Sequence, residues 1–213
     1  MLAEQIAQLD MQSGGRIDVG VARGTDPSTF AALGIPPDEA RGRFQEALSV
    51  LLAAWTRPTV SGTGPTWRFE NVAVGPPPVQ RPHPPGYVAA VSPETIELAA
   101  RHSMPLLLSL EPNEARQIPP YREALARSGS LAPLAASSLS RYVIVAPTRA
   151  EANRRLDLLL ARLNERRARL AKSRGQEPPV PRSRATMLSD HAVAGTPQDC
   201  ADQIRAHCLR LGV

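Results

Sequence analysis

Residues 14–24 read Gly14-Gly-Arg-Ile-Asp-Val-Gly-Val-Ala-Arg-Gly24, a glycine turn followed by a short apolar strand that ends in an arginine. The small residues Ala22 and Gly24 flank Arg23, so a ligand can approach the backbone closely at this point. The guanidinium of Arg23 is a planar fork of N–H donors that matches a phosphate or a carboxylate. The stretch therefore predicts an anion-binding strand end at which Ala22, Arg23 and Gly24 contact a cofactor.

A second strand-to-helix junction, Tyr87-Val-Ala-Ala-Val-Ser-Pro-Glu-Thr95, predicts the same chemistry. It places the hydroxyls of Ser92 and Thr95 where a helix begins, and the free N–H groups of helix N-termini bind phosphate. The alternative readings are that Ser92 only caps the helix and that Arg23 forms a surface salt bridge. Two such junctions in one α/β chain favour a phosphorylated cofactor.

Composition limits the class of protein. With 213 residues, 42% of them hydrophobic, we expect one sizeable core and a single domain over residues 1–213. The net charge of +5 comes largely from arginines between residues 149 and 174, a stretch without aromatic residues. We interpret it as a solvated helix face, and we expect no nucleic-acid partner.

Targeting and redox signals favour a cytoplasmic protein. The first ten residues are amphipathic and acidic rather than signal-like, and no apolar run is long enough to span a bilayer, so we expect no membrane contact. Cys200 and Cys208 are about two helical turns apart, too far for a disulfide within one straight helix. We expect both thiols to be reduced.

Helical and extended patterns alternate along the chain. The expected helices are residues 2–12, 38–55, 93–102, 120–128, 149–172 and 197–211. The expected strands are residues 16–22, 86–91, 105–110 and 138–146. Residues 56–85 form an excursion with a β-hairpin and a proline-rich run, and residues 173–192 form a loop. Repeated β-then-α order predicts a parallel sheet, either a (β/α) barrel or an open doubly wound sheet.

Other polar residues give weaker signals. Arg41, Arg43 and Glu46 lie within about one turn of one another, which favours an ion pair inside the helix, although Arg41 could point to the cofactor. The histidines and cysteines lack the spacing of metal ligands, and no nucleophile motif is present, so we expect neither a metal site nor a covalent triad.

Several stretches in the expected order resemble the bacterial luciferase-like flavin-dependent monooxygenases. They run from residues 2–10 and 13–24 through the helix at residues 40–48 to the hairpin and proline stretch Trp67–Pro85. The resemblance continues at Ser92–His102 and at Gly195–Ile204, where the chain reads Gly-Thr-Pro-Gln-Asp-Cys-Ala-Asp-Gln-Ile.

The resemblance implies a TIM barrel whose flavin lies at the carboxyl ends of the strands. It places Arg23, Ser92 and Thr95 at the flavin phosphate, and Ala90 and Val91 against the ring. Because such barrels begin before and end after the matching part, the resemblance implies a partial barrel of about four parallel strands with a β-hairpin insertion. It identifies no catalytic residue, since the family's frequent catalytic histidine has no counterpart here.

The implied activity is oxygenation of a small organic substrate by reduced FMN and oxygen, with a flavin reductase as a partner. The alternatives are a deazaflavin-dependent hydride-transfer oxidoreductase and a non-catalytic flavin-binding fragment or dimer partner. Family barrels often dimerise, so we expect a homodimer.

Overall fold

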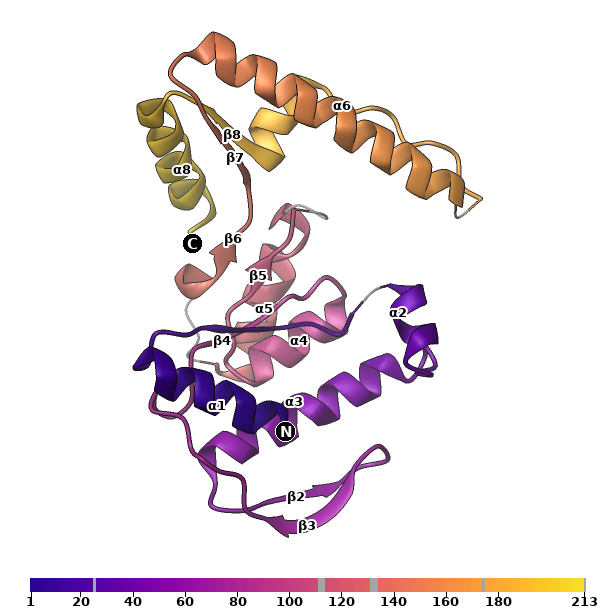
Figure 1. The fold of residues 1–213 in the computed structure, drawn as a ribbon, viewed down its shortest axis with the longest axis vertical. Coiled ribbons are helices and arrows are strands. Elements are labelled where there is room, and N and C mark those ends of the chain that lie inside the picture. The colour runs from indigo at the N-terminus through magenta and orange to yellow at the C-terminus, as the bar shows by residue number, and fades with distance from the viewer. Residues whose placement is uncertain (25, 111–113, 131–133, 174, 213) are drawn as a thin grey trace. The chain divides into compact units, whose positions relative to one another are not determined.

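The computed structural model describes residues 1–24, 26–110, 114–130, 134–173 and 175–212, and the ribbon is drawn in Figure 1. The chain divides into two compact units. Unit 1 comprises Met1–Leu107 and Glu123–Ala132, and unit 2 comprises Leu108–Arg122 and Pro133–Val213. That residues 1–213 act as a single domain stays a prediction.

Unit 1 begins with helices around one short strand. Helix α1 (Leu2–Ser13) ends where Gly14 adopts a left-handed conformation with φ 66°, as the glycine turn predicts. Strand β1 (Val19–Val21) is shorter than the expected strand at residues 16–22. Helix α2 (Pro27–Ala32) was not expected from the sequence, and α3 (Ala40–Thr56) matches the apolar period of residues 38–55.

The excursion after α3 contains the expected hairpin. Strands β2 (Val60–Thr63) and β3 (Arg68–Val72) pair antiparallel, with an irregular register near Gly62. The Glu46 carboxylate of α3 accepts hydrogen bonds from the backbone N–H groups of Thr66 at 3.1 Å and Trp67 at 2.8 Å, both in the turn. This carboxylate therefore fixes the hairpin to α3.

A parallel strand pair follows the proline-rich run. Strand β4 (Gly86–Val88) pairs with β1, and helix α4 (Pro93–Arg101) comes directly after it. Val88 also bridges Leu106 in parallel, just before β5 (Leu107–Leu108). A Cβ at Gly20 would lie 2.7 Å from Leu107 Cδ1, so a larger residue there would require the Leu107 side chain to move. The parallel, β-then-α order predicted from the sequence is confirmed here.

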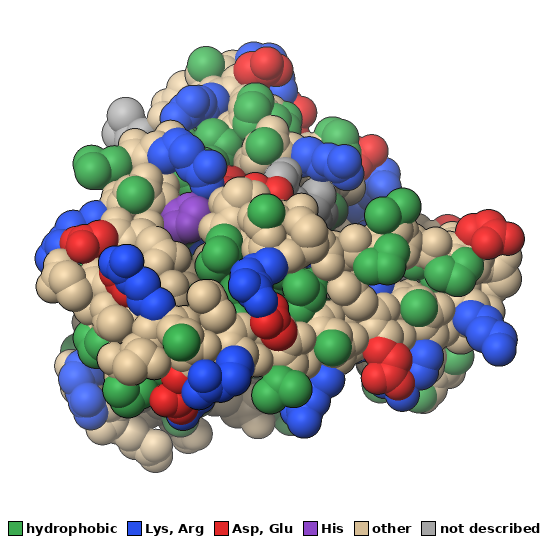
Figure 2. Space-filling view, turned by 90° about the horizontal axis from the view of Figure 1, so that it is seen from above, with side chains coloured by type: hydrophobic (Ala, Val, Ile, Leu, Met, Phe, Trp, Pro, Cys, Tyr) green, Lys and Arg blue, Asp and Glu red, His purple; other side chains and the backbone are tan. Residues whose placement is uncertain are grey.

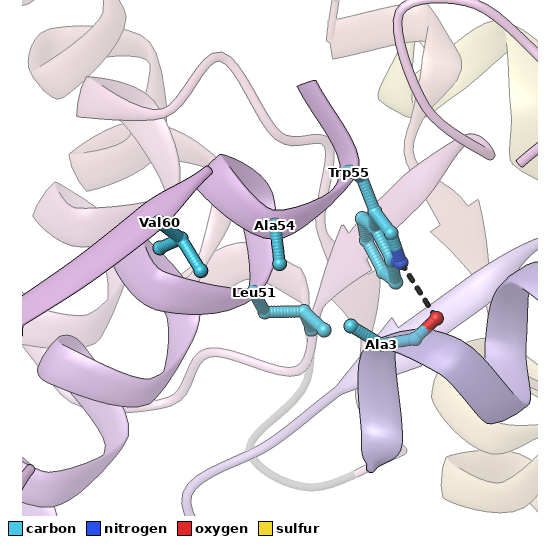
Figure 3. Packing of buried hydrophobic residues seen from close by; sticks show 5 residues of the cluster. All are labelled: Ala3, Leu51, Ala54, Trp55 and Val60. Atoms are coloured by element: carbon cyan, nitrogen blue, oxygen red, sulfur yellow. Dashed lines mark hydrogen bonds between the residues drawn. The ribbon is translucent and has the colours of Figure 1, made fainter. Parts of the chain in front are cut away.

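One hydrophobic cluster of unit 1 lies between α1, α3 and the hairpin. Figure 3 shows its buried members, Ala3, Leu51, Ala54, Trp55 and Val60. The Trp55 indole Nε1–H donates to the Ala3 carbonyl at 3.0 Å, which joins α3 to the start of α1. The indole therefore fills core volume and also satisfies its own polar group.

A buried aspartate, Asp10, lies near the C-terminal end of α1. The side chain of Asp10 is fully buried. Its Oδ2 accepts from the backbone N–H groups of Val79 at 2.6 Å and Gln80 at 2.9 Å, and Oδ1 accepts from Gln80 Nε2 at 2.8 Å. The same Gln80 amide donates to the Ile17 carbonyl at 2.8 Å. The carboxylate thus anchors the proline-rich loop to α1.

Unit 2 is built on a second parallel pair, β7 (Tyr142–Val145) and β8 (Ala192–Gly195). Helix α6 (Arg149–Ser173) connects them and packs Leu156 against Met187 and Ala192. Helix α8 (Pro197–Leu211) follows β8 and opens with a capping box formed by Thr196 and Asp199.

The remaining elements are short, apart from α5 (Ile118–Ser128), which starts in unit 2 and ends in unit 1. They are η1 (Glu114–Arg116), η2 (Leu134–Ala136), β6 (Ser138–Leu139), α7 (Arg184–Thr186) and η3 (Met187–His191).

Two expectations for this region need correction. The strand predicted at residues 138–146 is divided into β6, which pairs with β5, and β7. The loop predicted at residues 173–192 contains α7 and η3, because the Ser183 hydroxyl accepts the Thr186 N–H and starts a helix. Among the residues that the structure describes, no helix is both long and apolar enough to cross a membrane.

Candidate functional site

The carboxyl ends of β1 and β4 lie at the same edge of their sheet. The strands are parallel, Val21 pairs with Val88, and the Ala89 N–H donates to the Val21 carbonyl at 2.9 Å. Arg23 follows β1 by two residues, and Ser92 follows β4 by four. The two junctions singled out from the sequence therefore leave the sheet at one edge.

Both hydroxyls lie at the first turn of α4. Ser92 is the N-cap, with φ −85° and ψ 149°, and its Oγ accepts the Thr95 N–H at 3.4 Å. The two hydroxyl oxygens are 3.0 Å apart, and Thr95 is buried. The capping role of Ser92 is thus confirmed, and the same geometry holds two hydroxyls together at a helix N-terminus.

Arginines supply positive charge at this turn. Arg41 of α3 approaches Glu94 of α4, with Nη1 3.3 Å from Oε1. Hydrogen bonds from its own backbone N–H and from the Ser92 hydroxyl hold the pKa of Glu94 below its usual range, and the charges of Arg41 and Arg23 lower it further. Hydrogen bonds and arginine charges at the first turn of α4 therefore stabilise the ionised Glu94 carboxylate.

Arg23 itself is partly buried and forms no ion pair with any residue in the described part of the chain. The alternative reading, a surface salt bridge, therefore finds no partner there. Ala22 and Gly24 on either side are exposed, and Gly24 has φ +85°, a conformation that glycine adopts without strain.

The residues expected at the flavin ring differ in exposure. Ala90 is fully buried, whereas Val91 is 48% exposed. Both lie between β4 and Ser92, at the same sheet edge as Arg23. Their contact with a ring stays a prediction, and Val91 is the one of the two whose side chain reaches the surface.

An ion pair forms at the start of α3, but its acidic partner is Glu39 rather than the expected Glu46. Arg43 pairs with Glu39, with Nη2 2.8 Å from Oε2, and Glu46 faces the backbone of the hairpin turn. Arg41 reaches across to α4 instead. Arg43 therefore has its partner at the start of its own helix, whereas Arg41 and Glu46 have theirs on other elements.

An apolar cavity opens beside the same strand end. It has a volume of about 730 Å³ and is lined by α1, α3, the hairpin and residues 20–22 of β1 and its end. Leu48, Leu51, Phe69 and Val74 contribute to the wall, and Ala22, the neighbour of Arg23, lies at its edge. A volume of this size is typical of small-molecule sites.

Metal and thiol chemistry have little support in the described residues. Among them, no group of three or more His, Cys, Asp or Glu side chains could hold a metal ion. Cys200 and Cys208 are free thiols, the first buried and the second partly exposed. The candidate site for an anionic ligand is the pair of junctions that follow β1 and β4 in unit 1.

Comparison with known proteins bears on this site. The family model described as luciferase-like monooxygenase matches residues 1–213. The chain belongs to this family. The resemblance in its sequence motifs is thereby confirmed.

Relatives and solved structures agree with this assignment. The chain is 35% identical over 106 residues to the FMNH2-dependent dimethylsulfone monooxygenase of Pseudomonas putida, which covers 48% of this chain and 29% of that protein. Monooxygenase RslO1 from Streptomyces bottropensis matches with a TM-score of 0.82 at 27% identity, over 99% of this chain and 63% of that one.

The fold alone is shared with a third protein. The oxygenating constituent of 3,6-diketocamphane monooxygenase from Pseudomonas putida, solved in complex with FMN, gives a TM-score of 0.74 at 20% identity. That match covers 99% of this chain and 66% of the other. The fold is therefore of the luciferase-like TIM-barrel type, and the chain spans less than two thirds of the length of RslO1. A partial barrel with about four parallel strands stays a prediction.

Proposed function

We propose that this luciferase-like chain binds reduced FMN and takes part in flavin-dependent oxygenation of a small organic substrate. The observation that carries the proposal is the placement of Arg23, Ser92 and Thr95 just after the carboxyl ends of the parallel strands β1 and β4. The name of the dimethylsulfone relative, which specifies FMNH2, supports flavin as the phosphorylated cofactor.

The described residues fit a phosphate. Arg23 would bind it through its guanidinium fork, and the Ser92 hydroxyl would donate at the helix N-terminus beside Thr95. Arg41 would add a second positive charge after leaving Glu94, which is 3.3 Å away. Hydrogen bonds from its own backbone N–H and from Ser92 are the main causes of the lowered pKa of Glu94, and the charges of Arg41 and Arg23 add to them, so this turn offers both donors and positive charge to an anion.

The cofactor, when bound, supplies the electrons that activate oxygen, and the protein supplies binding, orientation and exclusion of water. Arg23 and Ser92 would hold the phosphate end and so fix the direction in which the ring extends, with Ala90 and Val91 along it. The apolar cavity at Ala22 favours an uncharged organic substrate, since it offers little to stabilise a charge. A flavin reductase would supply the reduced cofactor.

The test is a titration of the purified chain with FMN, followed by fluorescence. We expect Arg23→Ala to raise Kd by about 10- to 100-fold, because a hydrogen bond to a charged group contributes about 1.5–3 kcal/mol. Arg57→Ala is the matched control, since Arg57 is an exposed arginine at the far end of α3. Equal losses in both variants, or none in either, would contradict the phosphate site.

Further measurements on the same chain distinguish the alternative functions. A tighter complex with a deazaflavin than with FMN would favour hydride transfer, because a phosphate held by Arg23 and Ser92 is common to both cofactors. Stoichiometric FMN binding without oxygen uptake in the presence of reductant would favour a non-catalytic binding fragment. Light scattering on the same sample tests the proposed homodimer against the mass of 22.9 kDa for one chain.

A further inference from the structure

Helix α6 of unit 2 concentrates the charge of the protein. Its 25 residues include seven arginines and one lysine against three acidic residues, a net charge of +5. The whole chain also carries +5, so its other residues are balanced. At a rise of 1.5 Å per residue the helix is about 37 Å long.

One side of α6 is covered and the other is free. Ala152 and Leu156 are buried, and Leu160 and Leu163 pack against the same core of unit 2. The opposite side, called here the outer face of α6, is exposed along its length. Its members are Arg154, Leu158, Arg162, Arg166, Arg169 and Lys172.

Much of the positive charge on the outer face is not neutralised. Arg169 approaches Glu165 at 3.7 Å. In contrast, Arg154, Arg162, Arg166 and Lys172 form no ion pair with any residue that the structure describes. Four uncompensated cations on one side of a helix create a field that attracts an acidic partner.

The outer face also has an apolar centre. Leu158 is 66% exposed, and it lies one turn from Arg154 and one turn from Arg162 on the same surface row. Figure 2 shows that basic, acidic and hydrophobic side chains lie side by side on one face of the molecule. An exposed leucine between arginines is typical of a protein interface, with an apolar centre and a charged rim.

We propose that the outer face of α6 docks an acidic surface of another protein, with Leu158 at the centre of the contact and Arg154, Arg162 and Arg166 around it. Charge complementarity selects this occupant. A second copy of the same face would bring like charges together, and the helix offers a nucleic acid no aromatic side chain for stacking. The proposal is independent of the flavin site, which lies in unit 1.

Fluorescence anisotropy with a labelled peptide of repeating Glu-Leu-Glu-Glu tests the surface, at about 0.15 M ionic strength, where exposed charges act over about 8 Å. We expect the double variant Arg162→Glu/Arg166→Glu to weaken binding at least about tenfold, because attraction becomes repulsion at two positions. The matched control is Arg57→Glu/Arg68→Glu, which changes the net charge equally at exposed positions of unit 1. The control should change the affinity less than about threefold, since screening limits distant charges.

The apolar centre has its own variant. Leu158→Ser should weaken the Glu-Leu-Glu-Glu peptide and leave poly-glutamate binding unchanged, because only the first probe buries leucine. Circular dichroism checks that each variant keeps its helices. The proposal is overturned if the control variant loses as much affinity as the double variant, if the peptide does not bind, or if duplex DNA or phosphatidylserine vesicles bind as tightly as the peptide.

Discussion

Replacing Asp10 with alanine should lower the free energy of unfolding by about 3–5 kcal/mol. The buried carboxylate accepts three hydrogen bonds, from the Val79 N–H at 2.6 Å, the Gln80 N–H at 2.9 Å and Gln80 Nε2 at 2.8 Å. Alanine leaves two backbone donors without an acceptor, and each costs about 1–3 kcal/mol. Since net stabilities are only about 5–15 kcal/mol, the loss is a large share of the total.

The isosteric variant Asp10→Asn separates charge from shape. Its one carbonyl oxygen can keep both backbone bonds, while its NH2 group meets the Gln80 amide, so we expect a smaller loss of about 1–2 kcal/mol. Urea unfolding followed by tryptophan fluorescence measures both variants. Asp18→Asn is the matched control, because Asp18 is exposed, and its effect should stay within about 0.5 kcal/mol.

The same carboxylate should make stability depend on acid pH. Burial alone would raise the pKa of Asp10, but bonds from the Gln80 backbone, the Gln80 side chain and the Val79 backbone outweigh it and bring the pKa below its ordinary value of 3.8. A lowered pKa stabilises the fold above pH 3.8, and this contribution is lost as the pH falls through the folded-state value. Wild type should therefore lose more stability below pH 3.8 than Asp10→Asn does. Parallel pH curves, or a loss under about 1 kcal/mol in Asp10→Ala, would refute the reasoning.

Three further outcomes are expected. Trp55→Phe should cost about 1–2 kcal/mol in urea unfolding, because it removes the buried hydrogen bond to α1; an unchanged midpoint would contradict this role. Burial raises the pKa of the Cys200 thiol, so Ellman's reagent should modify Cys208 first, and Cys208→Ser, but not Cys200→Ser, should abolish the fast phase. Glu46→Gln should speed hydrogen exchange at the Trp67 amide, because it weakens the acceptor of that N–H. Unchanged exchange would show that the hairpin turn is ordered without this hydrogen bond.

Elements with local signals could be predicted from the sequence. Helix α4 begins where Ser92 caps it and Pro93 opens its first turn, and α8 begins at Pro197 after Thr196. These capping signals act within a few residues, so the helix starts can be predicted from the sequence without knowledge of tertiary contacts. The parallel direction of β1 and β4 followed from the β-then-α order, whereas the pairing of these two particular strands was not predicted.

Features that depend on distant contacts could not be predicted. The spacing of Arg41 and Glu46 within one helix suggested a local pair, but the nearest partner of Arg41 is Glu94, from another helix. Strand β8 lies in a stretch of alanine and glycine with little intrinsic strand preference, and its pairing with β7 stabilises it. The position of Asp10 under the proline-rich loop likewise follows from tertiary packing.

At the candidate site, the Glu94 carboxylate would compete with a phosphate for the same donor groups. Its carboxylate accepts a hydrogen bond from the Ser92 hydroxyl and pairs with the Arg41 guanidinium. These are two of the groups that would bind the phosphate at the proposed site. Because this acid is tethered, its effective concentration exceeds that of small anions in solution. Inorganic phosphate must displace it with charge alone, whereas a flavin adds the binding energy of its ring. At the proposed site, this competition would favour large phosphorylated ligands over simple salts.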